Sequence, residues 1–184
     1  MTATRVLFAI ASIVVSALDV CAQTQRITIR AASAFDGKGR TIPNVTIVVA
    51  NGKIADVRSG EAVPPTYDLR GLTILPGLID THVHLDTHFG KDGTASNKGE
   101  TPSQVILYEA ENAWITLMAG FTTVQSIGSP SDVEVRAAIA RGVMPGPRLL
   151  TSIRPITENT GTPAQIREFV RKLKADESVN SSAS

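Results

Sequence analysis

Cysteine is almost absent from this chain, which has a single one, Cys21, among its 184 residues. We expect this residue to leave with an N-terminal leader, so that the mature chain has neither a disulfide nor a thiolate metal ligand. Any metal ion must then be held by histidine, by a carboxylate or by a modified lysine.

The sequence also lacks an excess of charge of either sign. Lys and Arg number 18 and Asp and Glu number 17, which gives a formal net charge of +1 at pH 7. This balance indicates no basic surface for nucleic acid. Hydrophobic residues make up 42% and charged residues 19%, proportions that are typical of a globular protein and exclude a disordered or fibrous one.

Long hydrophobic runs are missing too, and the longest one lies at the N-terminus. Residues 6–18 are apolar or small, but this run is shorter than the about 20 residues that a membrane-spanning helix needs. Small residues allow cleavage after Ala22, so we expect 1–22 to be a signal peptide and the protein to be periplasmic or secreted, with no membrane contact after cleavage. A lipoprotein modified on Cys21 is the less favoured alternative, because larger residues precede that cysteine.

Residues 23–75 contain short runs in which apolar and polar residues alternate, the pattern of β-strands. Two of these runs are joined by Asn51-Gly52. Asn-Gly between strand-like runs is a strong hairpin signal, because both residues tolerate positive φ. We expect a small β domain here, with a domain boundary near Pro76.

Beyond residue 100, predicted helices alternate with short, β-branched runs at 121–127 and 148–153. Each helix start carries a hydroxyl residue followed three positions later by Gln or Glu, the capping-box pattern. The pairs are Thr101 with Gln104, Ser131 with Glu134, and Thr162 with Gln165. Alternating strands and helices predict an α/β fold with a parallel sheet, either a barrel or an open sheet.

The first predicted helix carries one apolar stripe, which we expect to face the core. Its members are Leu107, Ala110, Trp114 and Leu117. The third helix is expected to end near Ala175. Residues 176–184 are polar and rich in Ser, so a disordered tail is predicted there.

The segment Pro76-Gly77-Leu78-Ile79-Asp80-Thr81-His82-Val83-His84 carries the chemistry. Side chains two apart in a strand share a face, so Asp80, His82 and His84 are expected on one side. They end a strand before a polar loop, which is where parallel α/β proteins place active sites. Neutral imidazole suits Zn²⁺, so His82 and His84 are predicted metal ligands rather than ordinary strand-edge residues.

Two further residues have open or minor roles near this segment. Asp80 either orients a ligand imidazole as a carboxylate behind the metal site, or is a hydrogen-bonded acid at the base of the strand. His88 lies in the polar loop four residues beyond His84. We expect it to be a solvated loop histidine.

The segment resembles the amidohydrolase superfamily, whose first barrel strand carries Pro-Gly, two hydrophobic residues and Asp-x-His-x-His after a small β domain. Residues 120–124 and 140–149 are similar to the branch of imidazolonepropionase-like enzymes and Xaa-Pro dipeptidases. The resemblance implies a composite β-sandwich beside a metal-dependent-hydrolase (β/α)8 TIM barrel. It also implies one or two divalent ions, expected to be Zn²⁺, that promote hydrolysis of an amide, cyclic amide or Xaa-Pro dipeptide C–N bond. His82 and His84 match the first-strand ligands.

The resemblance also implies ligands that have no counterpart here: a carboxylated Lys on strand four, His on strands five and six, and Asp on strand eight. A complete barrel needs about 250 residues, and this chain has 184 in all. We therefore expect 76–175 to form the first three βα units of a truncated barrel. The alternatives are an inactive amidohydrolase fragment and an exported metal-binding module.

The expected partner is a small molecule or a dipeptide substrate. A homo-oligomer is an open option, because the last strand of an incomplete barrel has an unpaired edge.

Overall fold

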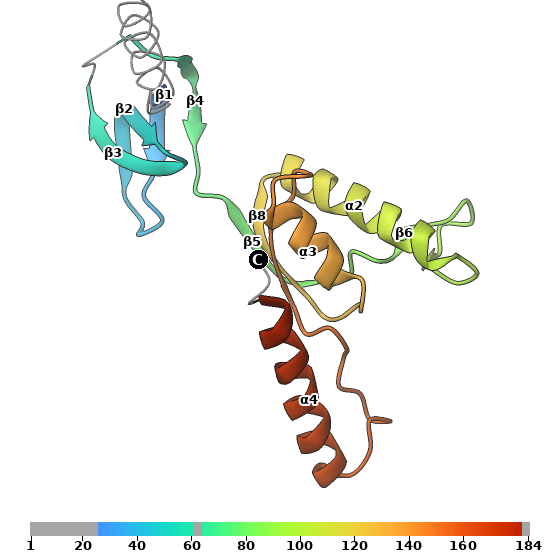
Figure 1. Cartoon of the computed structure of the whole chain (residues 1–184). Coiled ribbons are helices and arrows are strands. Elements are labelled where there is room, and N and C mark those ends of the chain that lie inside the picture. The colour runs from blue at the N-terminus through green and yellow to red at the C-terminus, as the bar shows by residue number, and fades with distance from the viewer. Residues whose placement is uncertain (1–25, 61–63, 182–184) are drawn as a thin grey trace, which may run out of the picture. The chain divides into compact units, whose positions relative to one another are not determined.

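The computed structural model describes residues 26–60 and 64–181, with side chains as far as residue 175. The predicted signal peptide lies outside these residues. The chain divides into two compact units, Met1–Pro76 and Gly77–Ser184 (Figure 1). Within the described ranges, no helix is both long and apolar enough to cross a membrane.

The first unit is a four-stranded sheet in the order β3-β2-β1-β4 (Figure 1). Its strands are β1 (Arg26–Phe35), β2 (Thr41–Ala50), β3 (Lys53–Ser59) and β4 (Tyr67–Ile74). β2 pairs antiparallel with β1 and β3, whereas β4 pairs parallel with β1. Asn51 and Gly52 join β2 to β3 with φ of 53° and 70°, as the hairpin motif predicts. The described strands of this first unit form one sheet, so the second layer of the predicted sandwich is not among them.

The second unit contains a three-stranded parallel sheet in the order β5-β8-β9. Its elements are β5 (Leu78–Val83), the short β6 (His88–Phe89) and β7 (Ala95–Ser96), α2 (Pro102–Met118), β8 (Phe121–Ser126), α3 (Asp132–Ala140), β9 (Arg148–Thr151) and α4 (Pro163–Ser181). The three strands of the parallel sheet alternate in sequence with α2, α3 and α4, so the predicted α/β class with a parallel sheet is confirmed.

Helices α2 and α3 pack on this sheet and on each other, α2 against β8 and α3 against β9. The core between them is formed by Leu85, Ala113, Val124, Val135 and Leu149. The apolar stripe predicted for α2 was wrong, because Leu107 is 70% exposed and Trp114 is 49% exposed. α2 buries Glu109 and Ala113 instead. Apolar residues occur on several faces of α2, so spacing alone could not identify the buried one.

Two of the three predicted capping boxes are present. At α2, the Thr101 side chain accepts from the Gln104 backbone while Gln104 accepts from the Thr101 N–H. Thr162 and Gln165 form the same reciprocal pair before α4.

The capping box predicted at Ser131 was wrong. Ser131 precedes α3 with helical dihedral angles and makes no side-chain cap bond. Its hydroxyl lies 2.6 Å from the Ser129 hydroxyl. Asp132 takes over the polar contact at this helix start, because its Oδ2 accepts from the Ser129 N–H at 2.9 Å.

Helix α4 extends to Ser181, beyond the end expected near Ala175. The disordered tail predicted from residue 176 is therefore helical as far as 181, and 182–184 lie outside the described residues. The segment 176–181 contains neither Gly nor Pro. Its polar residues lower helix propensity only slightly, so they do not stop a helix that is already formed.

Gly77 permits the close approach of β5 to β8. A Cβ added at Gly77 would lie 2.0 Å from Thr122 Oγ1. We predict that Gly77→Ala lowers the free energy of unfolding by about 1–3 kcal/mol, because one strand must shift. Urea unfolding followed by circular dichroism measures this change.

Gly71→Ala is the matched control, because no heavy atom lies within 4 Å of a Cβ at Gly71. Its effect should stay within about 0.5 kcal/mol. Equal effects of the two substitutions would contradict the close contact at Gly77.

Candidate functional site

His82 and His84 lie together at the carboxyl end of β5, and both are exposed. Their ring centroids are 5.3 Å apart, with an angle of 64° between the ring planes. Val83 pairs with Ser126, and Ser126 pairs with Thr151. The carboxyl ends of all three parallel strands therefore meet at the edge that carries the imidazoles, which is the position that the sequence predicts.

Asp80 contacts the backbone of the histidine segment. The register of β5 against β8 shifts between Asp80 and Val83. At this irregularity, Asp80 Oδ1 accepts a hydrogen bond of 3.0 Å from the backbone N–H of His82. The carboxylate thus supports the strand where regular pairing fails, and bulges of this kind are common beside active sites. An additional role of Asp80 in orienting an imidazole stays a prediction.

Asn112 of α2 holds the chain that follows His84. Its Nδ2 donates to the backbone oxygens of Leu85 and Thr87, each at 2.8 Å. Leu85 itself is 3% exposed and belongs to the core. Sequence reasoning missed Asn112, because a polar residue in the middle of a helix gives no sign of the distant carbonyl groups that it serves.

Three carboxyl groups lie close to the same segment, and sequence reasoning missed them as well. Glu109 and Asp132 have no exposed surface. Asp86 is half-buried, and burial raises its pKa, although it accepts a 3.0 Å hydrogen bond from Asn97. Burial also raises the pKa of Glu109, to about 8, and the Asp132 carboxyl adds to this rise. The only sequence signal was a Glu in an otherwise largely apolar stretch of α2.

His88 belongs to the short β6–β7 hairpin and packs against α2. Its ring stacks on Tyr108 with 3.7 Å between centroids and 14° between planes. Its Nε2 lies 3.1 Å from Glu100 Oε1, and its side chain is 23% exposed. The prediction of a solvated loop histidine was therefore wrong, because stacking on Tyr108 and the contact with Glu100 remove much of the ring from water.

A groove of about 380 Å³ lies beyond the carboxyl ends of β8 and β9. Its walls are mostly apolar and include Ile127, Ile153, Val170 and Leu173, with Arg154 and Lys174 also lining it. The groove occupies the same edge of the sheet as the histidine pair. Within the described residues, no group of three or more His, Cys, Asp and Glu side chains is placed to hold a metal ion.

The histidine segment and the parallel βα units that follow it match a known family. The sequence profile of the amidohydrolase family matches residues 73–183, and the chain belongs to this family. Members of the superfamily are metal-dependent.

Relatives match only part of their own length. A 5-methylthioadenosine/S-adenosylhomocysteine deaminase of Bacillus thuringiensis (strain Al Hakam) is 42% identical over 53 residues, which are 26% of this chain and 12% of the deaminase. The chain therefore spans a small part of the curated relatives that it matches.

Solved structures share the fold. A Xaa-Pro dipeptidase with bound methionine in the active site superposes with a TM-score of 0.73 and 24% identity, over 83% of this chain and 45% of the dipeptidase. The A. niger ochratoxinase has a TM-score of 0.58 and 26% identity, over 70% of this chain and 31% of that one. Molinate hydrolase has the same TM-score and identity, over 70% and 30%.

We predict that Asn112→Ala loosens the segment after His84. Loss of both donated bonds leaves two carbonyl groups without their partner, so the free energy of unfolding should fall by about 1–3 kcal/mol. Amide hydrogen exchange at residues 84–88 should accelerate. Asn159→Ala is the control, because Asn159 is exposed; equal exchange in the two variants would contradict the role of Asn112.

Proposed function

We propose that this chain provides the first metal-binding strand of a hydrolase that cleaves C–N bonds. The observation that carries the proposal is the pair His82 and His84, whose rings lie 5.3 Å apart at the carboxyl edge of a parallel sheet. Family membership supports the same chemistry. This support does not depend on the geometry of the two rings.

The donor set fits a divalent ion of the zinc type. Two neutral imidazoles on one side of a strand end suit Zn²⁺, and both side chains are exposed, so an ion can reach them. His82 and His84 would hold the ion, and Asp80 would fix the backbone between them. A bound ion of this kind supplies a water of lowered pKa and polarises the scissile carbonyl group.

Two imidazoles are fewer than the three protein ligands that a catalytic zinc site usually has. We therefore propose that β5, β8 and β9 are the first three strands of a (β/α)8 barrel whose further strands supply the remaining ligands. On this proposal, the 184-residue chain alone binds metal weakly and does not hydrolyse substrate.

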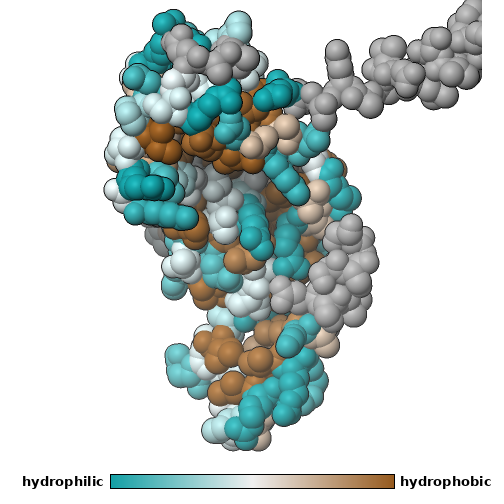
Figure 2. Space-filling view, turned by 90° about the vertical axis from the view of Figure 1, so that its left-hand side faces the viewer, coloured by the Kyte–Doolittle hydropathy of each residue, from teal (hydrophilic) through white to brown (hydrophobic). Residues whose placement is uncertain are grey.

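Exposed apolar side chains support the barrel. Leu78 and Ile79 of β5 are 49% and 66% exposed, and Leu150 of β9 is 40% exposed. β5 and β9 are also the two edges of the described sheet. Figure 2 shows hydrophobic side chains, in brown, at several places on the surface of the molecule. Closure of the sheet into a barrel, or association of two copies, would bury apolar surface of this kind.

The substrate class is proposed from the relatives. An amide or Xaa-Pro dipeptide bond is the first candidate, because the chain belongs to the amidohydrolase family and shares the fold of a Xaa-Pro dipeptidase. Hydrolytic deamination of a purine derivative is a second candidate, because the deaminase shares 42% identity over its matched stretch. Hydrolysis assays with both substrate types, on a protein that contains this chain within a complete barrel, would distinguish the two candidate reactions.

We also propose that the protein is exported. The support is the sequence of 1–22, whose short apolar run precedes a small-residue cleavage point. Sequencing the N-terminus of the protein recovered from an expressing bacterial host should give Gln23 as the first residue. Recovery of a chain that retains Cys21 would contradict cleavage after Ala22.

His82→Ala and His84→Ala should each abolish or strongly weaken Zn²⁺ binding to the 184-residue chain. Each substitution removes one of two ligands. Even the substitution of a residue that only orients a metal ligand weakens metal affinity by about 10–100-fold. Equilibrium dialysis against Zn²⁺ measures the bound metal.

His88→Ala is the matched control, because the chain has 3 histidines and His88 is engaged with Glu100 and Tyr108. It should leave Zn²⁺ binding unchanged. Unchanged binding in the His82 and His84 variants, or loss of binding in the His88 variant, would overturn the assignment.

A further inference from the structure

The carboxyl groups of one residue of α2 and one residue of α3 interact where these two helices pack on each other. Glu109 of α2 and Asp132 of α3 are both 0% exposed. In the described residues, no N–H or O–H group lies in hydrogen-bonding geometry to either Glu109 oxygen or to Asp132 Oδ1. Two neighbouring buried carboxyl groups would be strongly unfavourable if both were ionised.

The other oxygen of Asp132 is well supplied with donors. Asp132 Oδ2 accepts from the Ser129 N–H at 2.9 Å and from the Thr151 hydroxyl at 2.5 Å. Asp132 is also the first residue of α3, and a helix N-terminus favours negative charge. These contacts supply two donors to one oxygen of Asp132, and the contact with Thr151 joins α3 to β9.

Glu109 has the opposite surroundings. Three side chains shift the pKa of Glu109: Ser131 and Asp132 from the start of α3, and Asp86 from the loop after β5. Asp86 and Asp132 are acidic, and His84 lowers the pKa of Asp86. Among the described residues, no cation is a cause of the pKa shift of Glu109, so ionisation of Glu109 would add a further negative charge beside Asp132 and Asp86.

We propose that Glu109 and Asp132 share one proton, with Glu109 protonated and donating to Asp132. Two facing carboxyl groups can form a hydrogen bond only when one of them carries a proton. The shared proton would give Glu109 and Asp132 Oδ1 a well-formed hydrogen bond, which neither has with any other group of the described residues. The bond links α2, whose Asn112 holds the segment after His84, to α3 and β9.

The titration of Glu109 follows this geometry. Burial, supported by the hydrogen bond that protonated Glu109 donates to Asp132, raises the pKa of Glu109 from 4.5 to about 8, while the Ser131 hydroxyl lowers it. Because the folded pKa lies above the unfolded one, the contribution to stability is fully present below pH 4.5. It is lost progressively as the pH rises to about 8.

The test is urea unfolding of the full chain, without added metal, between pH 5 and pH 9. In the wild type, the unfolding constant should rise by up to about tenfold per pH unit below about pH 8, through this one proton. Glu109→Gln should remove that dependence, because the amide N–H donates to Asp132 at every pH.

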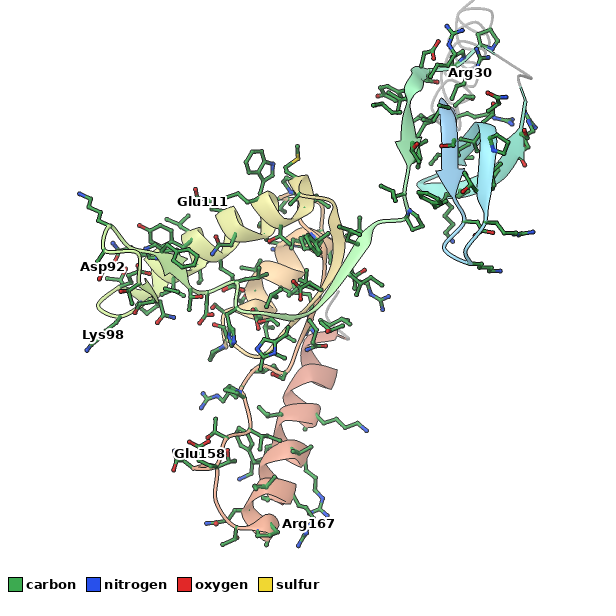
Figure 3. All side chains as sticks on the ribbon, turned by 180° about the vertical axis from the view of Figure 1, so that it is seen from behind. Arg30, Asp92, Lys98, Glu111, Glu158 and Arg167 are labelled. Atoms are coloured by element: carbon green, nitrogen blue, oxygen red, sulfur yellow. The ribbon has the colours of Figure 1, made fainter. Side chains whose placement is uncertain are left out.

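The control is Glu111→Gln, the same change at an exposed residue of α2 that is labelled in Figure 3. It should keep the wild-type pH dependence. A Glu109→Gln protein with the wild-type dependence would overturn the proposal.

Infrared spectroscopy of the wild type does not depend on the folding of any variant. The carbonyl stretch of a protonated carboxylic acid should be present at pH 7 and disappear near pH 8 to 9. Its absence at pH 7 would overturn the proposal, and so would its loss on titration with Ca²⁺ or Mg²⁺ at constant pH, since a cation would then replace the proton.

Discussion

The parallel pairing of β5 with β8 and of β8 with β9 is the constraint on which the rest of the second unit depends. Parallel strands place their carboxyl ends at one edge, and the register aligns Val83, Ser126 and Thr151 there. The histidine pair, the loop that α2 holds and the apolar groove all belong to this edge. If this pairing changed, none of these features would remain together.

Sequence reasoning predicted the features that depend on local chemistry. Asn51-Gly52 predicted the hairpin because positive φ is a property of those two residues. Thr101 and Gln104 predicted a helix start because the capping box needs no partner outside the segment. The position of His82 and His84 followed from strand periodicity, and their placement at the carboxyl edge followed from the α/β order.

The contacts that sequence reasoning missed all join distant segments. Glu109 and Asp132 meet across α2 and α3, and Asn112 serves carbonyl groups more than twenty positions earlier in the chain. Ser131 had the right residue type for a cap, but its hydroxyl bonds to the Ser129 hydroxyl. Asp132 instead makes the polar contact at the helix start, by accepting from the Ser129 N–H. Spacing patterns report which residues share a helix face, not which neighbour that face meets.

On the function proposed above, the histidine pair binds a metal at the carboxyl edge of the parallel sheet. Paramagnetic broadening by Cu²⁺ bound to the isotope-labelled chain, followed by NMR, locates the bound ion. Amide signals of Ser126, Ile127 and Thr151 should broaden before those of Phe121 and Arg148, which lie at the opposite ends of β8 and β9. Equal broadening at both ends, or broadening centred on Phe121 and Arg148, would contradict it.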